Sequence, residues 1–234
     1  MSLGANATVH PTVTVIVPVL NEVAHIAATL QALAGWRAQG TEVIVVDGGS
    51  TDGTREACAG LADTVLRSPR GRARQMMLGT AHAHGAVLLF LHADTRLPPG
   101  ALAAIGAALA SGRHAWGRFD VAINGTSPLL PLVARLMNLR SRLTGIATGD
   151  QAMFVTRAAF DAVGGFPDQL LMEDVELSRR LRRVGPPACL RLRVLTSGRR
   201  WEQFGVWRTV LLMWRLRWRY WRGTPADELA SHYR

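Results

Sequence analysis

The chain has 234 residues, 48% of them hydrophobic and 19% charged, and this balance excludes a disordered or fibrous protein. It contains no Lys, and its 27 Arg residues give a net charge of +10 that is distributed unevenly. Residues 1–178 hold 13 Arg against 14 acidic residues, whereas residues 179–234 hold 14 Arg against 3. Because Arg binds phosphate bidentately, the basic C-terminal quarter favours a phosphate group, an anionic lipid or a nucleic acid as partner.

The two cysteines, Cys58 and Cys189, form neither a zinc-site spacing nor a disulfide framework, which favours a reducing, cytoplasmic compartment. Residues 1–11 lack the basic start and apolar core of a signal peptide. No uninterrupted apolar run approaches the ~18 residues that are needed to span a bilayer. We therefore expect a protein that is soluble or lies on a membrane surface.

Strands and helices alternate along the first half of the chain. β-Branched residues predict a strand at 12–20, and a helix follows at 21–36 with Asn21 as its N-cap. The pattern continues as a strand at 41–47, a helix at 50–62, a strand at 63–69, a helix at 72–85, a strand at 86–94 and a helix at 98–112. Such alternation predicts βαβ units and a mostly parallel sheet, whose ligands bind beyond the carboxyl ends of the strands.

The rhythm changes after residue 113. The pattern predicts a strand at 115–123, a helix or lid-like segment at 128–143, a strand, helix and turn within 149–168, a helix at 172–185 and a strand at 188–198. We expect one domain over residues 1–198 and a basic, amphipathic helical appendage over residues 199–234.

Two predicted strands end on an acidic residue, Asp47 in "VIVVDGGSTDGT" and Asp94 in "LLFLHAD". Either acid alone is compatible with a turn or a helix cap. Together they favour a shared site, because a hard divalent cation binds carboxylate oxygens and substrate phosphates. His92 lies on the same strand face as Asp94 and is a second candidate metal ligand. The Gly-rich turn itself matches neither GxGxxG nor the P-loop.

Two further segments allow both a structural and a functional interpretation. Glu173 and Asp174 begin a predicted helix, where acids either compensate the helix dipole or act as a general base. Residues 67–75 place four Arg around a turn that enters a helix. This turn suits an anion such as pyrophosphate, or it is a solvated basic loop.

Six segments occur in an order and spacing that resembles the family-2 glycosyltransferases: "VIVPVLNE", "VIVVDGGSTDGT", "LLFLHADT", "ATGDQAMFV", "GGFPD" and "LMEDVELSRRL". From about residue 12 onward the chain is most similar to the small bacterial subgroup called "transferase 2, rSAM/selenodomain-associated". The resemblance implies an α/β fold of the GT-A type, a Rossmann-like three-layer sandwich. It also implies a hexosyltransferase-type enzyme that uses a nucleotide-diphospho-sugar and a divalent cation, Mn²⁺ or Mg²⁺.

The resemblance also implies roles for individual residues. Asp94, with His92 in place of the family's first acid, is expected to hold the metal. Asp174, with Glu173 beside it, is expected to be the base of an inverting transfer, so that Asp174→Asn keeps donor binding and stops transfer. Asp150 and Gln151 are expected to border the acceptor-sugar region. The residues expected to contact the nucleotide-sugar are Pro18, Asn21, Glu22, Asp47, Gly49, Arg72 and Asp94.

The chain departs from the family pattern at two informative places. Many relatives have a second acid after the strand-two Asp, near the nucleotide base, where this chain has Gly48. The choice between UDP- and GDP-linked donors therefore stays open. "RRWEQ" has the Arg-Trp pair of processive synthases without the preceding Gln, and no membrane span accompanies it, so a processive synthase is disfavoured.

The tail at 199–223 carries five Trp and seven Arg, with Trp207, Leu211, Trp214 and Trp218 at helical spacing, joined by Val210. This amphipathic pattern fits a helix at the inner face of the cell membrane, or one that packs on its own domain or on a second subunit. Arg and aromatic residues also stack on RNA bases, but no nucleic-acid module accompanies them, and we expect no nucleic-acid partner.

The sequence thus favours a glycosyltransferase at the cytoplasmic membrane face that modifies a hydroxyl acceptor, with a lipid-linked acceptor as one option. Two rival functions stay open. A nucleotidyltransferase would release pyrophosphate from an NTP, although it usually has a Gly-rich basic loop where this chain has "PVLNE". A non-catalytic sugar-nucleotide-binding protein would bind the donor without turnover.

Overall fold

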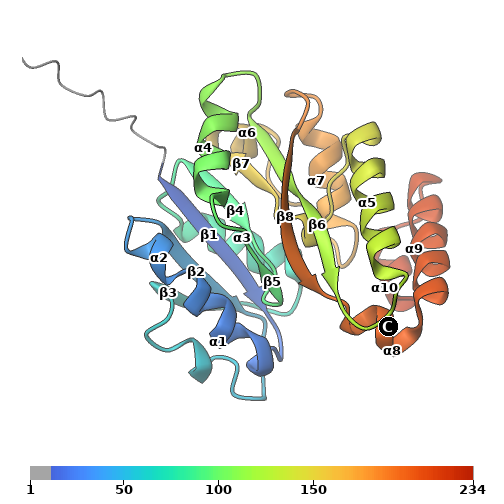
Figure 1. Cartoon of the computed structure of the whole chain (residues 1–234), viewed down its shortest axis with the longest axis horizontal. Coiled ribbons are helices and arrows are strands. Elements are labelled where there is room, and N and C mark those ends of the chain that lie inside the picture. The colour runs from blue at the N-terminus through green and yellow to red at the C-terminus, as the bar shows by residue number, and fades with distance from the viewer. Residues whose placement is uncertain (1–11, 234) are drawn as a thin grey trace, which may run out of the picture.

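The computed structural model describes residues 12–233 and has a central eight-stranded sheet with helices on both faces (Figure 1). The strands are β1 Val13–Val19, β2 Glu42–Asp47, β3 Thr64–Arg67, β4 Val87–Phe90, β5 Thr95–Arg96, β6 Trp116–Asn124, β7 Phe154–Thr156 and β8 Ala188–Ser197. The helices are α1 Val23–Ala32, α2 Ala34–Arg37, α3 Arg72–His82, α4 Ala101–Ala110, α5 Leu130–Thr144, α6 Arg157–Ala162, α7 Glu173–Leu181, α8 Arg199–Phe204, α9 Val206–Trp221 and α10 Ala226–Ser231. Two 3₁₀ turns, η1 Glu56–Cys58 and η2 Gly149–Gln151, complete the elements. The expectation about a signal peptide concerns residues 1–11, which lie outside the described residues.

The strands are arranged in the order β3-β2-β1-β4-β7-β6-β8-β5. The first four strands are parallel, as the alternation predicted, and β6 is parallel to β8. The pairings β4–β7, β6–β7 and β5–β8 are antiparallel, so the sheet is mixed and not parallel throughout. In the parallel half, Val19 pairs with Asp47 and Asp47 with Arg67, which places three strand ends at one edge. Ligands of such sheets bind beyond this edge.

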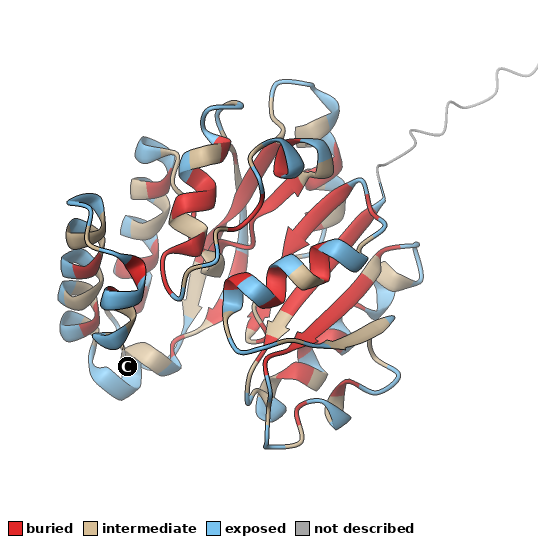
Figure 2. Cartoon of the chain, turned by 180° about the vertical axis from the view of Figure 1, so that it is seen from behind, coloured by how far each residue is buried: buried red, intermediate tan, exposed pale blue. Residues whose placement is uncertain are grey.

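Two hydrophobic cores lie on opposite faces of the sheet, and Figure 2 shows the strands buried between their helices. Side chains of alternate β1 residues point to opposite faces of the sheet, since Val15 and Val17 belong to one core and Ile16 belongs to the other. The first core packs against α1, α4 and α5, and the second against α3, α6 and α7. Gly79 lets α3 approach closely, because a Cβ there would lie 2.6 Å from Ile16 Cγ2. The three-layer α/β sandwich is therefore confirmed.

Three predicted elements differ from the structure. The helix expected at 50–62 is reduced to the 3₁₀ turn η1, because residues of this segment instead cap α1 from outside. The helix expected at 21–36 is divided into α1 and α2, and Asn21 is not its N-cap but precedes the capping residue Glu22 with a φ of 54°. The strand expected at 86–94 ends at Phe90, and β5 pairs separately with β8.

The tail forms three helices instead of one. Gly205 separates α8 from α9, and its φ of 81° favours glycine. Helix α10 follows α9. A small cluster of Leu171, Met172, Leu216 and Leu229 anchors these helices to the domain. Within the described residues, no helix has the length and apolar character needed to cross a bilayer.

The buried side of α9 is not the tryptophan side. Trp207, Leu211, Trp214 and Trp218 are 57–65% exposed, and Trp221 is 81% exposed. Helix α5 shows a comparable exposed row of Leu132, Leu136, Leu139 and Leu143. The aromatic stripe therefore does not pack on its own domain.

Candidate active site

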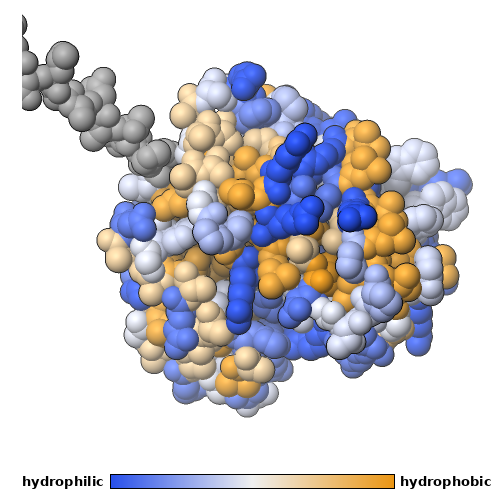
Figure 3. Space-filling model, in the orientation of Figure 1, coloured by the Kyte–Doolittle hydropathy of each residue, from blue (hydrophilic) through white to orange (hydrophobic). Residues whose placement is uncertain are grey.

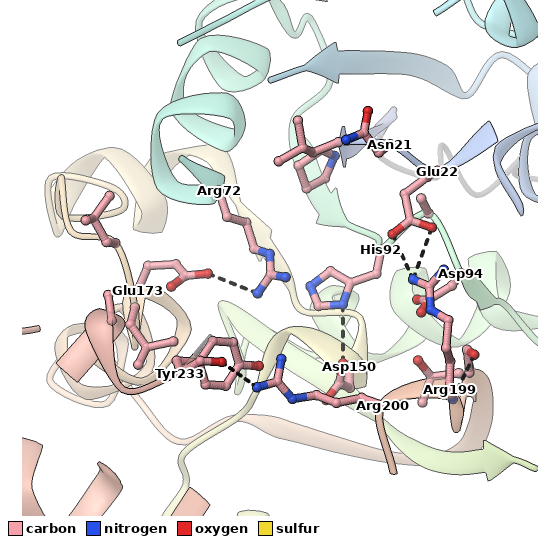
Figure 4. A pocket seen from close by; sticks show the side chains of 18 of the residues that line it. Asn21, Glu22, Arg72, His92, Asp94, Asp150, Glu173, Arg199, Arg200 and Tyr233 are labelled. Atoms are coloured by element: carbon pink, nitrogen blue, oxygen red, sulfur yellow. Dashed lines mark hydrogen bonds and ion pairs between the residues drawn. The ribbon is translucent and has the colours of Figure 1, made fainter. Parts of the chain in front are cut away.

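A cavity of about 1050 Å³ opens at the carboxyl ends of β1 and β4, bounded by the start of α3, the start of α7 and the helical tail. Figure 4 shows how its charged side chains converge from these elements. The predicted site residues that line it are Pro18, Asn21, Glu22, Arg72, His92, Asp94, Asp150 and Glu173. Four other predicted residues, Asp47, Gly49, Gln151 and Asp174, lie outside this lining.

Asp47 closes the turn that follows β2. Its Oδ1 accepts hydrogen bonds from the Ser50 amide at 3.0 Å and from Ser50 Oγ at 2.5 Å. Asn21 joins the same turn, because its Oδ1 accepts from the Thr51 amide and its own amide donates to Ser50 Oγ, both at 2.9 Å. The carboxylate is 1% exposed, so Asp47 shapes the floor behind the cavity. Gly49, with a φ of 95°, completes this turn.

The rest of the Gly-rich segment caps α1. The Glu22 amide donates to Thr54 Oγ1 at 2.7 Å, and the Val23 amide donates to Asp52 Oδ2 at 3.1 Å. Asp52 Oδ1 also accepts from the amide and hydroxyl of Thr54. Free amides at a helix start need such acceptors. The Ser, Thr and Asp residues of "GGSTDGT" therefore hold the α1 end of the cavity in place.

Gln75 joins the two strand ends and was not predicted as a site residue. Its Nε2 donates to the carbonyls of Val19 and Val46, both at 2.8 Å, and its side chain is buried. The side-chain amide also fills the space beside Gly48, where a Cβ would lie 3.0 Å from Gln75 Cδ. A larger residue at Gly48 would therefore require the Gln75 side chain to shift. A polar residue on the buried side of a predicted helix was the available signal.

Arg72 and Glu173 face each other across the cavity, with Arg72 Nη1 3.5 Å from Glu173 Oε1. The Arg72 side chain is 48% exposed, whereas that of Glu173 is 4% exposed. Burial raises the pKa of Glu173; the positive charge of Arg72 opposes this change and the negative charge of Asp174 adds to it. The long contact leaves Arg72 able to bind an incoming anion.

His92 is turned toward η2. Its Nδ1 lies 3.3 Å from Asp150 Oδ1, and a Cβ at Gly149 would overlap Nε2. Burial acts to raise the pKa of Asp150, but the hydrogen bond from His92 and the charges of His92, Arg72 and Arg217 outweigh it and lower the pKa. Nδ1 of His92 is thus paired with the η2 segment, and Nε2 lies close to Gly149.

Asp174 supports the same segment. Its Oδ2 accepts from the Gly149 amide at 2.8 Å, and its Oδ1 accepts from the Val175 amide at 2.7 Å. Gln151, which is fully buried, donates through Nε2 to Asn138 Oδ1 at 3.4 Å. Asp174 and Gln151 thus fix η2, on which Asp150 is carried into the cavity.

The capacity for metal binding rests on Asp94. Within residues 12–233, no three His, Cys, Asp or Glu side chains come together as a metal-binding cluster. Asp94 is half-buried at the cavity wall, where Thr95 Oγ1 is 3.4 Å from its Oδ1. A single carboxylate fits Mg²⁺, which commonly takes its other oxygens from substrate phosphates and water.

The tail contributes residues that the sequence did not assign to the site. Arg199 Nη2 lies 3.1 Å from Glu22 Oε1 and so joins α8 to the end of β1. The Arg200 guanidinium stacks on the Tyr233 ring, 3.7 Å from its centroid, and donates to the Tyr233 carbonyl at 2.8 Å. The Arg pair at 199–200 was visible in the sequence, but its partners are distant in the chain.

Comparisons with known proteins agree with this architecture. Mannosyltransferase PcManGT from Pyrobaculum calidifontis, in complex with GDP-Man and Mn²⁺, is 24% identical over 80% of this chain and 57% of its own, with a TM-score of 0.63. Staphylococcus aureus TarS 1–349, in complex with UDP-GlcNAc, is 19% identical over 80% of this chain and 58% of its own, with a TM-score of 0.62. The chain thus spans less than two thirds of these structures, and the likeness shows a shared GT-A fold.

The curated proteins contain no significant match to the chain. The sequence profile described as "Glycosyl transferase family 2" matches residues 14–161. The matched region covers most of the chain, from the start of β1 to α6, and includes Asp47, Arg72 and Asp94. The chain therefore belongs to glycosyl transferase family 2.

Proposed function

We propose that the protein transfers a sugar, with inversion, from a nucleotide-diphospho-sugar to a hydroxyl acceptor. The observation that carries this proposal is the cavity at the strand ends, which collects Arg72, Asp94, Asp150 and Glu173. Family membership supports the reaction class. The similar structures that hold GDP-Man or UDP-GlcNAc support a donor of this chemistry.

We propose that the donor diphosphate binds between Arg72 and Asp94. Arg72 begins α3, so the free amides of the helix start and the guanidinium both favour an anion. Asp94 would hold Mn²⁺ or Mg²⁺, and the bound ion would neutralise charge on the leaving diphosphate. We assign the ion to Asp94 and not to His92, because Nδ1 of His92 is paired with Asp150.

Asp174 is proposed as the base, since it stays partly exposed while backbone amides orient both of its oxygens. It accepts the proton of the acceptor hydroxyl as that oxygen attacks the anomeric carbon of the donor. The bond from this carbon to the diphosphate oxygen breaks, and the nucleoside diphosphate leaves with the electron pair. Glu173, which lines the cavity, is the competing candidate because burial raises its pKa.

Asp150 is proposed to hydrogen-bond sugar hydroxyls on the acceptor side. It lines the cavity, its side chain is 45% exposed, and it is held by His92 from one side. Gln151 supports this segment from below through Asn138. The acceptor-sugar role of both residues is the one that the family resemblance implies. Membership of the rSAM/selenodomain-associated subgroup also stays a prediction.

We also propose that the enzyme works at the inner face of the cell membrane. The exposed Leu row of α5, visible as a hydrophobic patch in Figure 3, and the exposed Trp-Leu row of α9 offer apolar side chains to lipid. Exposed Arg208, Arg215 and Arg222 lie on α9 or at its end, and they complement an anionic surface. The occupant of this surface is therefore proposed to be the bilayer.

A thermal-shift screen of UDP- and GDP-sugars, each with and without Mn²⁺ or Mg²⁺, tests the donor site directly. We expect one nucleotide class to raise the melting temperature only with metal, and Asp94→Asn to abolish this increment. A nucleotidyltransferase would instead release pyrophosphate from an NTP and a sugar phosphate. A non-catalytic protein would bind the donor without any transfer or hydrolysis. Stabilisation by no nucleotide-sugar would contradict the proposal.

A further inference from the structure

Six buried side-chain polar atoms of the described residues have no hydrogen-bond partner. Buried polar groups nearly always find a partner, so each exception calls for an explanation. Those of residues 12–233 come from β6, α5, the residue before η2, and α9. The side-chain atoms concerned are Arg118 Nε, Arg140 Nε and Nη2, Ser141 Oγ, Thr148 Oγ1 and Arg217 Nε.

Arg140 on α5 and Arg217 on α9 are two of these residues, and their like charges lie within electrostatic range of each other. Neither guanidinium has an ion pair or a hydrogen bond to a residue in the part of the chain that the structure describes. Burial and the nearby charge of Arg217 lower the pKa of Arg140 to about 10. Two half-buried cations that lack a counterion are costly to maintain, so their proximity needs a compensating anion.

Asp174 and Asp150, whose charges act on the two Arg residues, do not supply that anion. Asp174 influences Arg140 and Asp150 influences Arg217, but only as neighbouring charges. The oxygens of Asp174 accept from Gly149 and Val175, and Asp150 pairs with His92. The charge of Arg140 therefore reaches the proposed base and that of Arg217 reaches Asp150, while neither acid forms an ion pair with them among the described residues.

The Arg pair also adjoins the two exposed apolar rows. Arg140 directly follows Leu139 in α5, and Arg217 directly precedes Trp218 in α9. Leu139 and Trp218 are 52% and 57% exposed. A molecule with an apolar chain could thus rest on the rows while its charged end reaches between the two helices.

We propose that Arg140 and Arg217 bind the phosphate group of a phosphorylated acceptor and hold its hydroxyl near Asp174. This inference rests on the proposed function, because it assigns the acceptor class of the same site. Guanidinium forks match phosphate oxygens bidentately. The phosphate neutralises the Arg pair and satisfies its free N–H groups, while Arg72 and Asp94 are left to the donor.

Titration of the full-length protein with inorganic phosphate and with hexyl phosphate, without donor or metal, tests the site. We expect Arg140→Gln and Arg217→Gln each to weaken hexyl phosphate binding about tenfold. Arg135→Gln on α5 is the matched control, since its side chain is exposed on the same helix as Arg140, and it should change binding little.

The source of the phosphate is distinguished by a third probe, vesicles of phosphatidylcholine that contain phosphatidic acid. Binding of hexyl phosphate and of these vesicles, each dependent on Arg140 and Arg217, supports a lipid headgroup. Equal dependence for inorganic phosphate, without any for vesicles, supports a soluble phosphorylated acceptor. Either result supports a phosphate site.

Melting temperatures separate a binding role from a structural role. Removing one of two repelling charges should leave the unliganded protein equally or more stable, while the stabilisation by hexyl phosphate is lost. A large drop in the melting temperature of Arg217→Gln and of Arg217→Lys would show that the pair is structural and would overturn the proposal. Equal hexyl phosphate affinity in all variants would overturn it as well. Neither result depends on donor binding, so the proposed reaction is tested separately.

Discussion

The donor end of the cavity and its α5–α9 side differ in whether their polar side chains have hydrogen-bond partners. At the donor end, Asp47, Asp52 and Gln75 bind neighbouring amides, hydroxyls or carbonyls. On the α5–α9 side, Arg140 and Arg217 have no such partner among the described residues, and large apolar side chains stay exposed. The first region is complete by itself, whereas the second needs something from outside. This contrast fits the proposal that the donor binds a preformed surface and that the acceptor side is completed by its ligand and by the membrane.

Substitution of the proposed base, at the junction of the two regions, has the largest expected effect. Asp174→Asn should lower the transfer rate about 10³-fold, because positioned bases contribute roughly 10²–10⁴-fold, and should leave donor affinity unchanged. Rates of sugar transfer and donor dissociation constants measure the two quantities. Glu173→Gln is the matched control. An inactive Glu173→Gln beside a fully active Asp174→Asn would transfer the role to Glu173.

Breaking the self-contained donor end should cost stability. Gln75→Leu leaves the buried carbonyls of Val19 and Val46 without a donor, and we expect unfolding to become easier by about 2–4 kcal/mol. Chemical denaturation measures the change. Gln39→Leu is the control, since Gln39 is exposed and bonds only within its own helix end. Equal stability of the two variants would show that the strand ends do not need Gln75.

Substitutions on the exposed α5–α9 side should weaken membrane binding and leave the stability of the protein unchanged. Trp214→Glu and Leu136→Glu each remove an apolar contact with lipid, so each should weaken binding to anionic vesicles about tenfold or more. Vesicle sedimentation measures this loss, and the melting temperature should stay constant. Val184→Glu, 48% exposed near the end of α7, is the control. Unchanged sedimentation of both α5 and α9 variants would remove the membrane from the proposal.

The smallest effect concerns the contact between α7 and the tail. Hydrogen bonds from Arg179 and Arg180 lower the pKa of Glu176 to about 2, and Tyr220 OH lies 3.4 Å from Glu176 Oε2. Because the folded pKa lies below the ordinary value, this stabilisation is present above about pH 4.5 and is lost as the pH falls toward about 2. Glu176→Gln should cost about 1 kcal/mol at neutral pH and flatten the acid dependence. Parallel acid-unfolding curves of both proteins would contradict this expectation.

Local sequence patterns were sufficient to locate the parallel strands of the sheet and to bring several candidate residues to the edge where the cavity opens. Apolar runs located β1, β2 and β4, and the acids that follow them mark the edge where Asp94 reaches the cavity. The same patterns failed at residues 50–62, because the Ser, Thr and Asp side chains there cap a different helix. Helix propensity depends on hydrogen bonds within one segment, whereas Asp52 and Thr54 accept hydrogen bonds from the start of α1 in another segment.

The α5–α9 side could not be predicted for a related reason. Arg140 and Arg217 are 77 positions apart, and each alone reads as a solvated helix residue. Their significance appears only when the fold brings both to one place without a counterion. The exposure of the Trp row likewise depends on which side of α9 meets Leu171 and Met172, and the helical period does not specify this choice.

The contact between Gln75 and Gly48 also has an evolutionary consequence. An acid at position 48 requires the Gln75 side chain to shift, since even a Cβ there would lie 3.0 Å from Gln75 Cδ. We therefore expect an acid at 48 to be accommodated more easily when position 75 carries a smaller side chain. A directed-evolution library aimed at nucleotide preference should accordingly randomise both codons, so that each replacement at 48 is sampled together with a compatible side chain at 75.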